Sequence, residues 1–333
     1  MNFFSIPHLP SGRCVLSLLI SSMIYCPAVL PQGESNSAKP EIPANSVLNP
    51  PDGYTSSAKS KSKFTPPVWP PIDVDAAEVA LDSQVPCLLP SVLKGASQHA
   101  TEFSANLDRF TATEIIQSAD AQKYGSWTHF QTNTFDYMAI VTRPRAGVVY
   151  VDESRLGKPQ ATPLRIQTEG LAVTALIFHP QNINEFDMQC EGLSNWRGTP
   201  SWTVHFAQKA GKAADFQVIH ADGKRFPVKL KGRAWIAADS YEIEHIDVDL
   251  LEQIPEIRLF TEHLSIDYGS VKFTNGSSRL WLPEQADFFL ELGDHHFFNH
   301  HEMSNFVLFS VGVKQDLKEP PQPKQPAKVR TAK

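Results

Sequence analysis

Histidines and carboxylates gather near the end of the chain, in the stretch GDHHFFNHHEM. Imidazole and carboxylate groups together bind Zn²⁺ or Ni²⁺. We expect this stretch to lie in a hairpin, where adjacent side chains point to opposite faces, so that only His296 with His300, or His295 with His301, converge across the turn. HHEMS also lacks the second histidine of the zincin helix pattern. A polar hairpin end with adventitious metal affinity is the preferred interpretation, and His296 and His300 remain weak metal candidates.

The rest of the sequence holds no established catalytic motif. There is no G-x-S-x-G, no Walker glycine loop and no G-x-G-x-x-G. In YEIEHIDVDLLE, Glu242 with Glu244, or Asp247 with Asp249, would share one face of a strand. Paired acids hydrolyse glycosides only within a cleft and at a set separation, whereas a solvated outer face explains the pattern without chemistry. We therefore predict no catalytic residue, no enzyme activity and no cofactor.

Composition is that of an ordinary globular protein, with 333 residues of which 41% are hydrophobic. The formal net charge of -6 argues against a nucleic-acid partner, which requires a basic surface. The basic, proline-rich end of the chain is the exception. It permits a peripheral electrostatic contact with an anionic membrane surface, although a solvated tail is the commoner explanation.

The chain divides into four parts by composition. Residues 1–32 read as a signal peptide, because the apolar run Cys14–Leu30 is interrupted by a proline before it reaches the length of a membrane span. Residues 33–75 and 314–333 are rich in proline and polar residues, so we predict a disordered tether and a disordered tail. The remaining residues, 76–313, form one domain. The protein is thus expected in the periplasm or cell envelope.

Four cysteines occur, and two of them, Cys14 and Cys26, fall in the signal segment. Cys87 and Cys190 remain in the mature chain, and an isolated pair in an oxidising compartment tends to bridge. We predict a Cys87–Cys190 disulfide, with two separately buried thiols as the alternative. Lipidation at Cys26 stays open, because the bulky Tyr25 precedes it.

Strands of alternating polarity dominate from residue 228 to 313, which predicts one antiparallel sheet. The alternation changes phase near Glu244–His245 and near Phe260–His263, which predicts two β-bulges and strong curvature. Apolar residues at helical spacing predict a helix over Leu88–Phe110, and the apolar run Thr168–Phe178 predicts a second, buried helix. Further strands are expected at Thr111–Ser118, His129–Thr142, Gly147–Asp152, Phe186–Leu193 and Ser201–Ala207.

Several of these segments carry a resemblance to known families. GRAWIAADSYEIEHIDVDL, IDYGSVKF and LWLP resemble the later strands of LolA-like proteins, the class of outer-membrane lipoprotein carriers. FTATEII, ALIFHP and MQCEGL also resemble an uncharacterised family of exported bacterial proteins found chiefly in Acidobacteria. The resemblance implies an α+β fold, mainly antiparallel β. In it a strongly curved sheet forms an incomplete barrel, with the N-terminal helix and a second helix packed on the concave face.

A half-barrel of this kind implies non-enzymatic binding of an apolar ligand: a lipid, an acyl chain or a lipidated protein. Two alternatives remain, an envelope adaptor that binds another protein through a dry-cored sheet, and a metal-dependent hydrolase that uses His295–His301. Aromatic residues on the strands read as ordinary core, but in an open cavity we expect Trp235 and Trp281 to face it. The full set of cavity candidates is Phe103, Leu107, Trp235, Trp281 and Phe288.

Overall fold

The computed structural model describes most of the chain between Phe64 and Phe309, together with a short segment near its start. The described residues are 2–6, 64–82, 84–157, 168–210, 217–221, 224–273 and 279–309. Apart from residues 2–6, the expected signal segment lies outside the described residues. The expected tail and the tether up to residue 63 also lie outside them, so these three expectations remain predictions.

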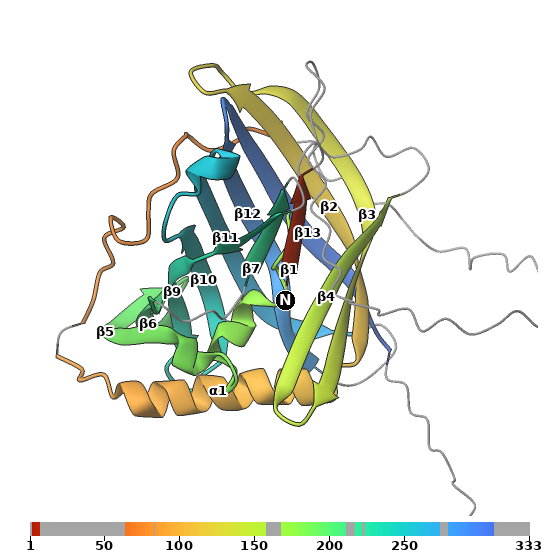
Figure 1. Ribbon diagram of the computed structural model, residues 1–333. Helices are drawn as coiled ribbons and strands as arrows, with labels where there is room; N and C mark the ends of the chain where they lie inside the picture. Colours follow the sequence, from red (N-terminus) through yellow and green to blue (C-terminus); the bar gives the residue numbers. More distant parts are fainter. Residues whose placement is uncertain are drawn as a thin grey trace, which may run out of the picture.

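One open sheet of ten strands forms the body of the molecule (Figure 1). Neighbouring strands pair antiparallel throughout, and β4 and β5 are the two edge strands, which matches the expected antiparallel, incomplete barrel. Each of the five strands expected before residue 210 coincides with or largely overlaps an observed one. In spatial order the strands are β4 (Val148–Gly157), β3 (Thr128–Arg145), β2 (Arg109–Gln122), β13 (His295–Phe309), β12 (Arg279–Leu292), β11 (Leu259–Lys272), β10 (Ile243–Leu250), β9 (Leu230–Ala237), β6 (Thr199–Gln208) and β5 (Phe186–Trp196).

A small second sheet lies on the hollow side of the large one (Figure 1). It consists of β1 (Asn2–Ile6), β7 (Gln217–Ala221) and β8 (Lys224–Val228), with β1 parallel to β7. Ile219 and Val228 join the main hydrophobic core, so this sheet helps to fill the hollow.

The helix α1 spans Leu89–Asn106 and confirms most of the expected helix. Val92, Ala96 and Ala100 recur at four-residue steps and are buried, and Pro90 fits the first turn. The expected last turn is absent because β2 begins at Arg109 and takes Phe110 into the sheet. Figure 1 shows α1 running along one end of the sheet, at the bottom of the view. Within the described residues, no helix is both long and apolar enough to span a membrane.

The prediction of a second α-helix over Thr168–Phe178 is not confirmed. The segment forms turns followed by a short 3-10 helix, η1 (Thr174–Phe178). Gly170 adopts a left-handed φ of +93°, and the Glu153 carboxylate accepts hydrogen bonds from the backbone N–H groups of residues 171–173. Those donors are thereby satisfied outside a helix. The apolar residues nevertheless pack inside the hollow as expected, so the apolar composition of the run predicted its burial but not its backbone conformation.

Both predicted β-bulges are present. The pairing of β10 with β9 shifts between Ile243 and His245, and the pairing of β11 with β12 shifts between Leu259 and Thr261. Further shifts occur along the sheet, for example between Asp267 and Tyr268. Each extra residue bends its strand, which accounts for the curvature of the sheet around its hollow side.

The outer face of the sheet is covered by residues 64–82, which we call the strap. The Trp69 ring stacks on His296 of β13 with 3.9 Å between centroids, and the Val74 N–H donates to Asp249 of β10 over 2.7 Å. The Asp82 N–H then reaches the edge strand β5 over 2.7 Å. Residues 64–75 were expected to belong to the tether. They lie against the sheet instead, because the rings of Phe64 and Trp69 pack on aromatic residues of its outer face.

Candidate functional site

A cavity of about 180 Å³ lies where α1 and η1 meet the sheet. We call it the α1 cavity. Its floor is apolar and aromatic, and its rim is polar. The lining residues are His99, Ala100, Glu102, Phe103 and Asn106 of α1, Ala175 and Leu176 of η1, and Glu242, Ile243, Tyr268, Leu280 and Trp281 of the sheet and its loops.

Two aromatic rings of the α1 cavity are held in place by hydrogen bonds of their own. The Trp281 indole N–H donates to the Ile243 carbonyl over 2.7 Å, and the Tyr268 hydroxyl donates to the Leu171 carbonyl over 3.3 Å. Burial raises the pKa of Tyr268 well above its ordinary value, so the phenol stays neutral. The cavity wall is therefore rigid and apolar before any ligand arrives.

Two carboxylates and one imidazole form the rim. His99 Nε2 donates to the Ser240 carbonyl over 2.7 Å, which turns Nδ1 toward Glu242 at 3.2 Å and Glu102 at 3.7 Å. Burial raises the pKa of Glu242, and the negative charges of Glu102 and Glu244 raise it further, while His99 lowers it. The rim therefore presents more negative than positive charge to the cavity.

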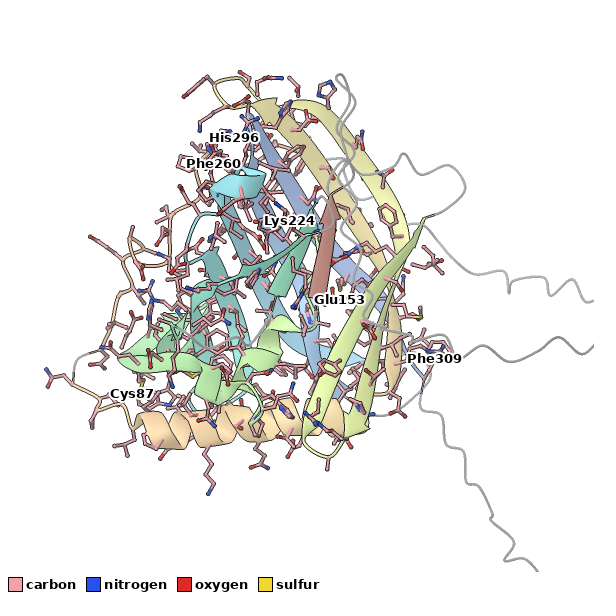
Figure 2. The ribbon with its side chains drawn as sticks, in the orientation of Figure 1. Cys87, Glu153, Lys224, Phe260, His296 and Phe309 are labelled. Atoms are coloured by element: carbon pink, nitrogen blue, oxygen red, sulfur yellow. A yellow bond between two sulfur atoms is a disulfide. The ribbon has the colours of Figure 1, made fainter. Side chains whose placement is uncertain are left out.

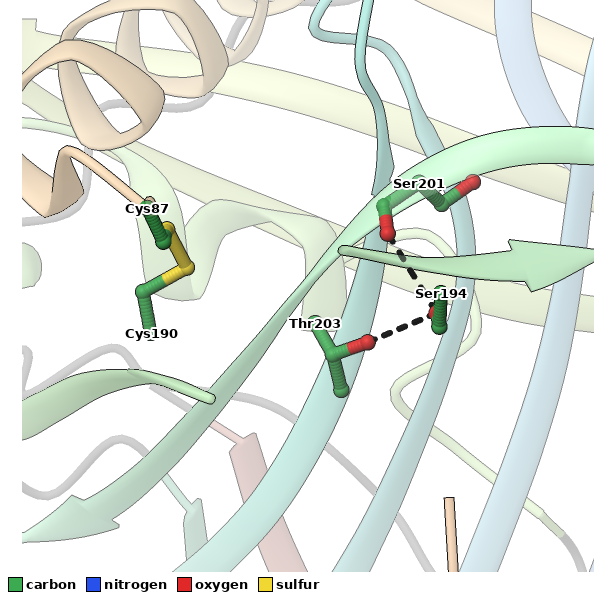
Figure 3. Close-up of a disulfide and its surroundings, with 5 residues drawn as sticks. All are labelled: Cys87, Cys190, Ser194, Ser201 and Thr203. Atoms are coloured by element: carbon green, nitrogen blue, oxygen red, sulfur yellow. Dashed lines mark hydrogen bonds between the residues drawn. A yellow bond between two sulfur atoms is a disulfide. The ribbon is translucent and has the colours of Figure 1, made fainter. Parts of the chain in front are cut away.

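The helix that roofs the α1 cavity is attached at both ends. Near its start, Cys87 forms a disulfide with Cys190 of the edge strand β5, with a Cα–Cα distance of 6.2 Å, which confirms the predicted bridge (Figure 3). Near its end, the Arg143 guanidinium on β3 donates to the carbonyls of Ser104 and Leu107. The helix thus bridges the two sides of the open sheet.

The edge that carries the disulfide has its own polar support. Figure 3 shows Ser194 of β5 hydrogen-bonded to the Ser201 carbonyl and to the Thr203 hydroxyl, at 3.3 and 2.7 Å. These contacts join β5 to β6 beside the bridge. The covalent attachment of α1 is therefore made to a strand that is fixed to the sheet by side chains as well as by backbone pairing.

The five cavity candidates from the sequence fall into three places. Phe103 and Trp281 line the α1 cavity. Leu107 and Phe288 belong to the buried core and do not line it. Trp235 lies on the opposite, outer face, where it packs on Trp196 and His245. The alternation on β9 indicates this placement, because Trp235 shares its phase with Lys231 and Arg233. The core residues Ala234 and Ile236 occupy the other phase.

The four histidines of GDHHFFNHHEM all lie on one strand, β13, and not across a turn. His295 lies 3.2 Å from Gln122, His300 lies 2.6 Å from Asp287, and His296 stacks on Trp69. His301 points into the hollow. Figure 2 places His296 near the end of the sheet that is remote from α1. Each ring thus has a separate partner, and the described residues contain no group of three or more side chains arranged to hold a metal ion.

His301 belongs to a buried polar network that the sequence did not reveal. Its Nδ1 donates to Glu114 over 2.8 Å, and its Nε2 lies 2.9 Å from the Thr168 hydroxyl. Arg155 forms a two-pronged ion pair with Glu114, at 2.6 and 2.9 Å. Although burial alone raises it, the charge of Arg155 and the hydrogen bond from His301 lower the pKa of Glu114 to about 2. Glu114 is therefore ionised, and burial keeps His301 neutral by lowering its pKa.

The order hydroxyl, imidazole, carboxylate in this network is that of a nucleophilic triad. Thr168 and His301 are nevertheless completely buried, and neither lines the α1 cavity. The Thr168 hydroxyl also accepts a hydrogen bond from Asn299 over 3.1 Å. The network therefore joins β2, β4 and β13 to the segment after Thr168 and has no access to a substrate.

Two further acids of the hollow face a second, very small cavity of about 20 Å³. Burial raises the pKa of Glu169 to about 9 and that of Glu262 to about 7. Gln217 donates to one Glu262 oxygen over 2.7 Å, while the other Glu262 oxygen and one Glu169 oxygen are buried without a hydrogen-bond partner. Glu153 lies nearby in the interior (Figure 2) and raises the pKa of Glu169 further.

The acidic strand YEIEHIDVDLLE is also not a solvated face throughout. His245 lies between Asp267 and Asp247, at 2.8 and 2.9 Å. His263 bonds to Asp249 over 2.7 Å. Burial lowers the pKa of His245, but the two aspartates outweigh it and raise the pKa overall. These pairs lie on the outer face beneath aromatic rings and the strap, so they stabilise that layer.

The rim of the α1 cavity is what sequence reasoning missed. His99 and Glu102 are three residues apart and flank the buried Ala100, so they mark the margin of the apolar stripe of α1. That position was a usable signal. Glu242 and Tyr268 gave none, because only the fold brings the start of β10 and the middle of β11 beneath the helix.

No protein-family model matches this chain, and no curated protein matches it. Solved structures that align with it include a DUF1329 family protein from Desulfovibrio piger, with 13% identity, a TM-score of 0.36 and coverage of 67% of this chain and 94% of the other. An outer membrane lipoprotein-sorting protein domain from Vibrio parahaemolyticus aligns with 10% identity, a TM-score of 0.32 and coverage of 67% and 95%. The lipoprotein LppX of Mycobacterium tuberculosis aligns with 13% identity, a TM-score of 0.24 and coverage of 65% and 95%. These similarities assign neither a family nor a ligand, so the function is argued from the chain's own residues.

Proposed function

We propose that this protein is an exported binding protein of the cell envelope that holds an apolar molecule, or the acyl chain of a lipid or lipidated protein, in the α1 cavity. The observation that carries the proposal is the cavity itself, which combines an apolar floor with a polar rim beneath a single helix. Such a combination is typical of small-molecule sites, in which apolar contact gives affinity and a few polar groups orient the ligand.

The volume of the α1 cavity limits the size of the ligand that can bind without movement of α1. An engineered apolar cavity of about 150 Å³ binds benzene, and the α1 cavity measures about 180 Å³. It therefore accepts one ring or a short alkyl segment. Desolvation of that segment supplies the driving force, at about 25 cal/mol per Å² of buried apolar surface before ordering costs.

A longer chain requires α1 to move. The helix is attached through Cys87 at one end and through Arg143 at the other. Between these points it packs on η1, and its His99 contacts Ser240 and Glu242. Displacing its middle would enlarge the α1 cavity. We therefore assign α1 the role of a lid whose two ends stay attached.

The interior supports binding better than catalysis. Glu114, Arg155 and His301 satisfy one another and do not point into the α1 cavity. The titratable side chains that do line it, His99, Glu102 and Glu242, lie at its rim. No hydroxyl or thiol nucleophile is among the described residues that line the cavity, apart from the phenol of Tyr268, which burial keeps protonated.

Binding is tested with N-phenyl-1-naphthylamine, a neutral apolar fluorophore whose emission rises when it leaves water. Its three rings exceed what the α1 cavity accepts as it stands, so its binding also requires α1 to move. We expect saturable binding to the wild-type protein. Replacing Ala175 by Phe inserts a ring into the cavity, so this variant should bind the probe about tenfold more weakly. Ala146→Phe, in the exposed turn between β3 and β4, is the matched control and should bind normally.

Native mass spectrometry of protein purified from its own envelope then identifies a natural ligand. A copurifying apolar mass supports the proposal. Absence of any such mass, together with no saturable fluorescence response, would contradict it. In that case the alternative of an adaptor with a dry core gains support, and crosslinking to a partner protein is the experiment that follows.

A further inference from the structure

The α1 cavity contains the two groups that recognise organic cations, aromatic faces and carboxylates. Phe103, Tyr268 and Trp281 line its floor, and Glu102 and Glu242 lie at its rim. An ammonium group is attracted to the face of a tryptophan or tyrosine ring, and aromatic cages of this kind bind quaternary ammonium ligands. A purely hydrocarbon ligand would need the rings but not the acids.

The rings are fixed before a ligand binds. Trp281 is tied to the Ile243 carbonyl and Tyr268 to the Leu171 carbonyl. Neither ring needs to reorganise when a cation approaches. Preorganised contacts of this kind raise affinity because their ordering cost is met during folding.

The rim carries excess negative charge. Glu102 and Glu242 share one imidazole, His99, and no lysine or arginine is among the described residues that line the cavity. Glu244 of β10 adds to the negative potential. Burial raises the pKa of Glu244, and the negative charge of Asp239 raises it further. Carboxylates that raise one another's pKa lack a nearby cation, and an ammonium group at the rim would supply it.

We propose that the ligand of the α1 cavity carries an ammonium group, which lies beside the Glu102 and Glu242 carboxylates and against the Trp281 and Tyr268 rings, with a short apolar portion on the cavity floor. This inference rests on the proposed binding function and names its ligand class. The cavity of about 180 Å³ has room for a trimethylammonium group or a comparable amine together with a short alkyl segment.

Three ligands that share an octyl chain separate charge from apolar contact: octyltrimethylammonium, octanol and octanoate, each used below its micelle concentration. Displacement of N-phenyl-1-naphthylamine reports their binding to the full-length protein. We expect octyltrimethylammonium to bind at least about tenfold more tightly than octanol, and octanoate to bind more weakly than octanol. Choline serves as a fourth ligand. If choline binds as tightly as octyltrimethylammonium, the natural ligand is a small free cation. If choline binds more weakly, the natural ligand is an amphiphile.

The double variant Glu102→Gln with Glu242→Gln removes the rim charges. It should lose most of the preference for octyltrimethylammonium over octanol, because only the rings then attract the ammonium group. Glu252→Gln, whose carboxylate pairs with Lys229 away from the cavity, is the matched control and should keep the preference. A Trp281→Leu variant should weaken the cation more than the alcohol.

The outcomes for ligand class and for function are distinct. If wild-type protein binds octanol as tightly as octyltrimethylammonium, the ammonium inference is wrong and the binding function stands. If none of the octyl ligands displaces the probe and the probe itself does not bind, the proposed function is wrong. The wild-type series decides both questions even where a variant does not fold.

Discussion

Buried carboxylates are unevenly compensated inside the hollow. Glu114 forms an ion pair with Arg155, whereas Glu169 is influenced by two like charges, Glu153 and Glu262, and by the opposite charge of Arg155. Burial therefore raises the pKa of Glu169 to about 9, and Glu153 and Glu262 raise it as well. At neutral pH the folded protein keeps Glu169 protonated. The interior is thus closer to electrical neutrality than its acidic composition suggests.

Replacing Glu169 by Gln should stabilise the protein increasingly as pH rises. An acid with a folded pKa of about 9 and an unfolded pKa of about 4.3 binds its proton more tightly when folded, so its contribution to stability falls from about pH 4.5 up to about pH 9. Gln keeps the shape without the titration. We expect the variant to gain about 1–4 kcal/mol relative to wild type between about pH 5 and about pH 8, measured by urea unfolding.

The matched control is Glu256→Gln, at an exposed position in the 3-10 helix η3 (Pro255–Ile257). Its stability relative to wild type should not change with pH. A Glu169→Gln variant whose advantage is the same at both pH values would show that Glu169 is ionised in the folded protein. The charge balance described above would then be incorrect.

Single residues were the hardest level to predict from sequence. Alternation on β9 shows that Lys231, Arg233 and Trp235 share a face, but not that Trp196 of β5 packs on Trp235 there. The assignment of Trp235 to the cavity failed for this reason. Phe103 and Trp281 do line the cavity, Phe103 from the apolar stripe of α1 and Trp281 from β12.

Elements were more predictable than residues, and the reason is periodicity. The phase changes within two strands located both bulges, since one extra residue necessarily reverses the faces. The run Thr168–Phe178 failed because an apolar run without alternation has no period to read. Its backbone was decided by Glu153, which comes from β4 and captures the donors that a helix would have used.

At the level of elements, the attachment of α1 to β3 can be broken separately from its disulfide. Arg143→Met keeps an unbranched apolar stem but removes the hydrogen bonds to the carbonyls of Ser104 and Leu107. We expect a loss of about 1–2 kcal/mol in the free energy of unfolding. Amide hydrogen exchange should accelerate in the last turns of α1 but not near Cys87, where the disulfide still holds the helix.

Arg145→Met is the control, because Arg145 is exposed at the end of the same strand. It should leave exchange in α1 unchanged. Uniform acceleration along the whole helix in Arg143→Met would indicate that α1 unfolds as one unit. That result would contradict a lid attached independently at its two ends.

The whole molecule is a curved sheet with both faces covered. α1, η1 and the small sheet fill the hollow, and the strap crosses the outer face from β13 to β5 before the chain enters the disulfide and α1. One continuous segment, 64–106, therefore passes from the outer face to the lid. Sequence composition could not predict this, because a proline-rich segment resembles a tether unless its few aromatic residues meet an apolar surface.

Trp69 attaches the strap to the outer face through aromatic contacts. Its ring stacks on His296 and contacts Phe289 and Trp127, so Trp69→Ala removes these contacts. Because Trp69 is half-buried, we expect a loss of roughly 1–3 kcal/mol, below the range for a fully buried tryptophan. Limited proteolysis should cut the strap earlier than in wild type. Val68→Ala, at a side chain that is 86% exposed, should change neither quantity.

Equal proteolysis of Trp69→Ala and wild type would mean that the polar contacts of Val74 and Asp82 hold the strap without Trp69. Faster cleavage confined to the strap, with the disulfide intact, would show that the outer layer opens independently of the lid.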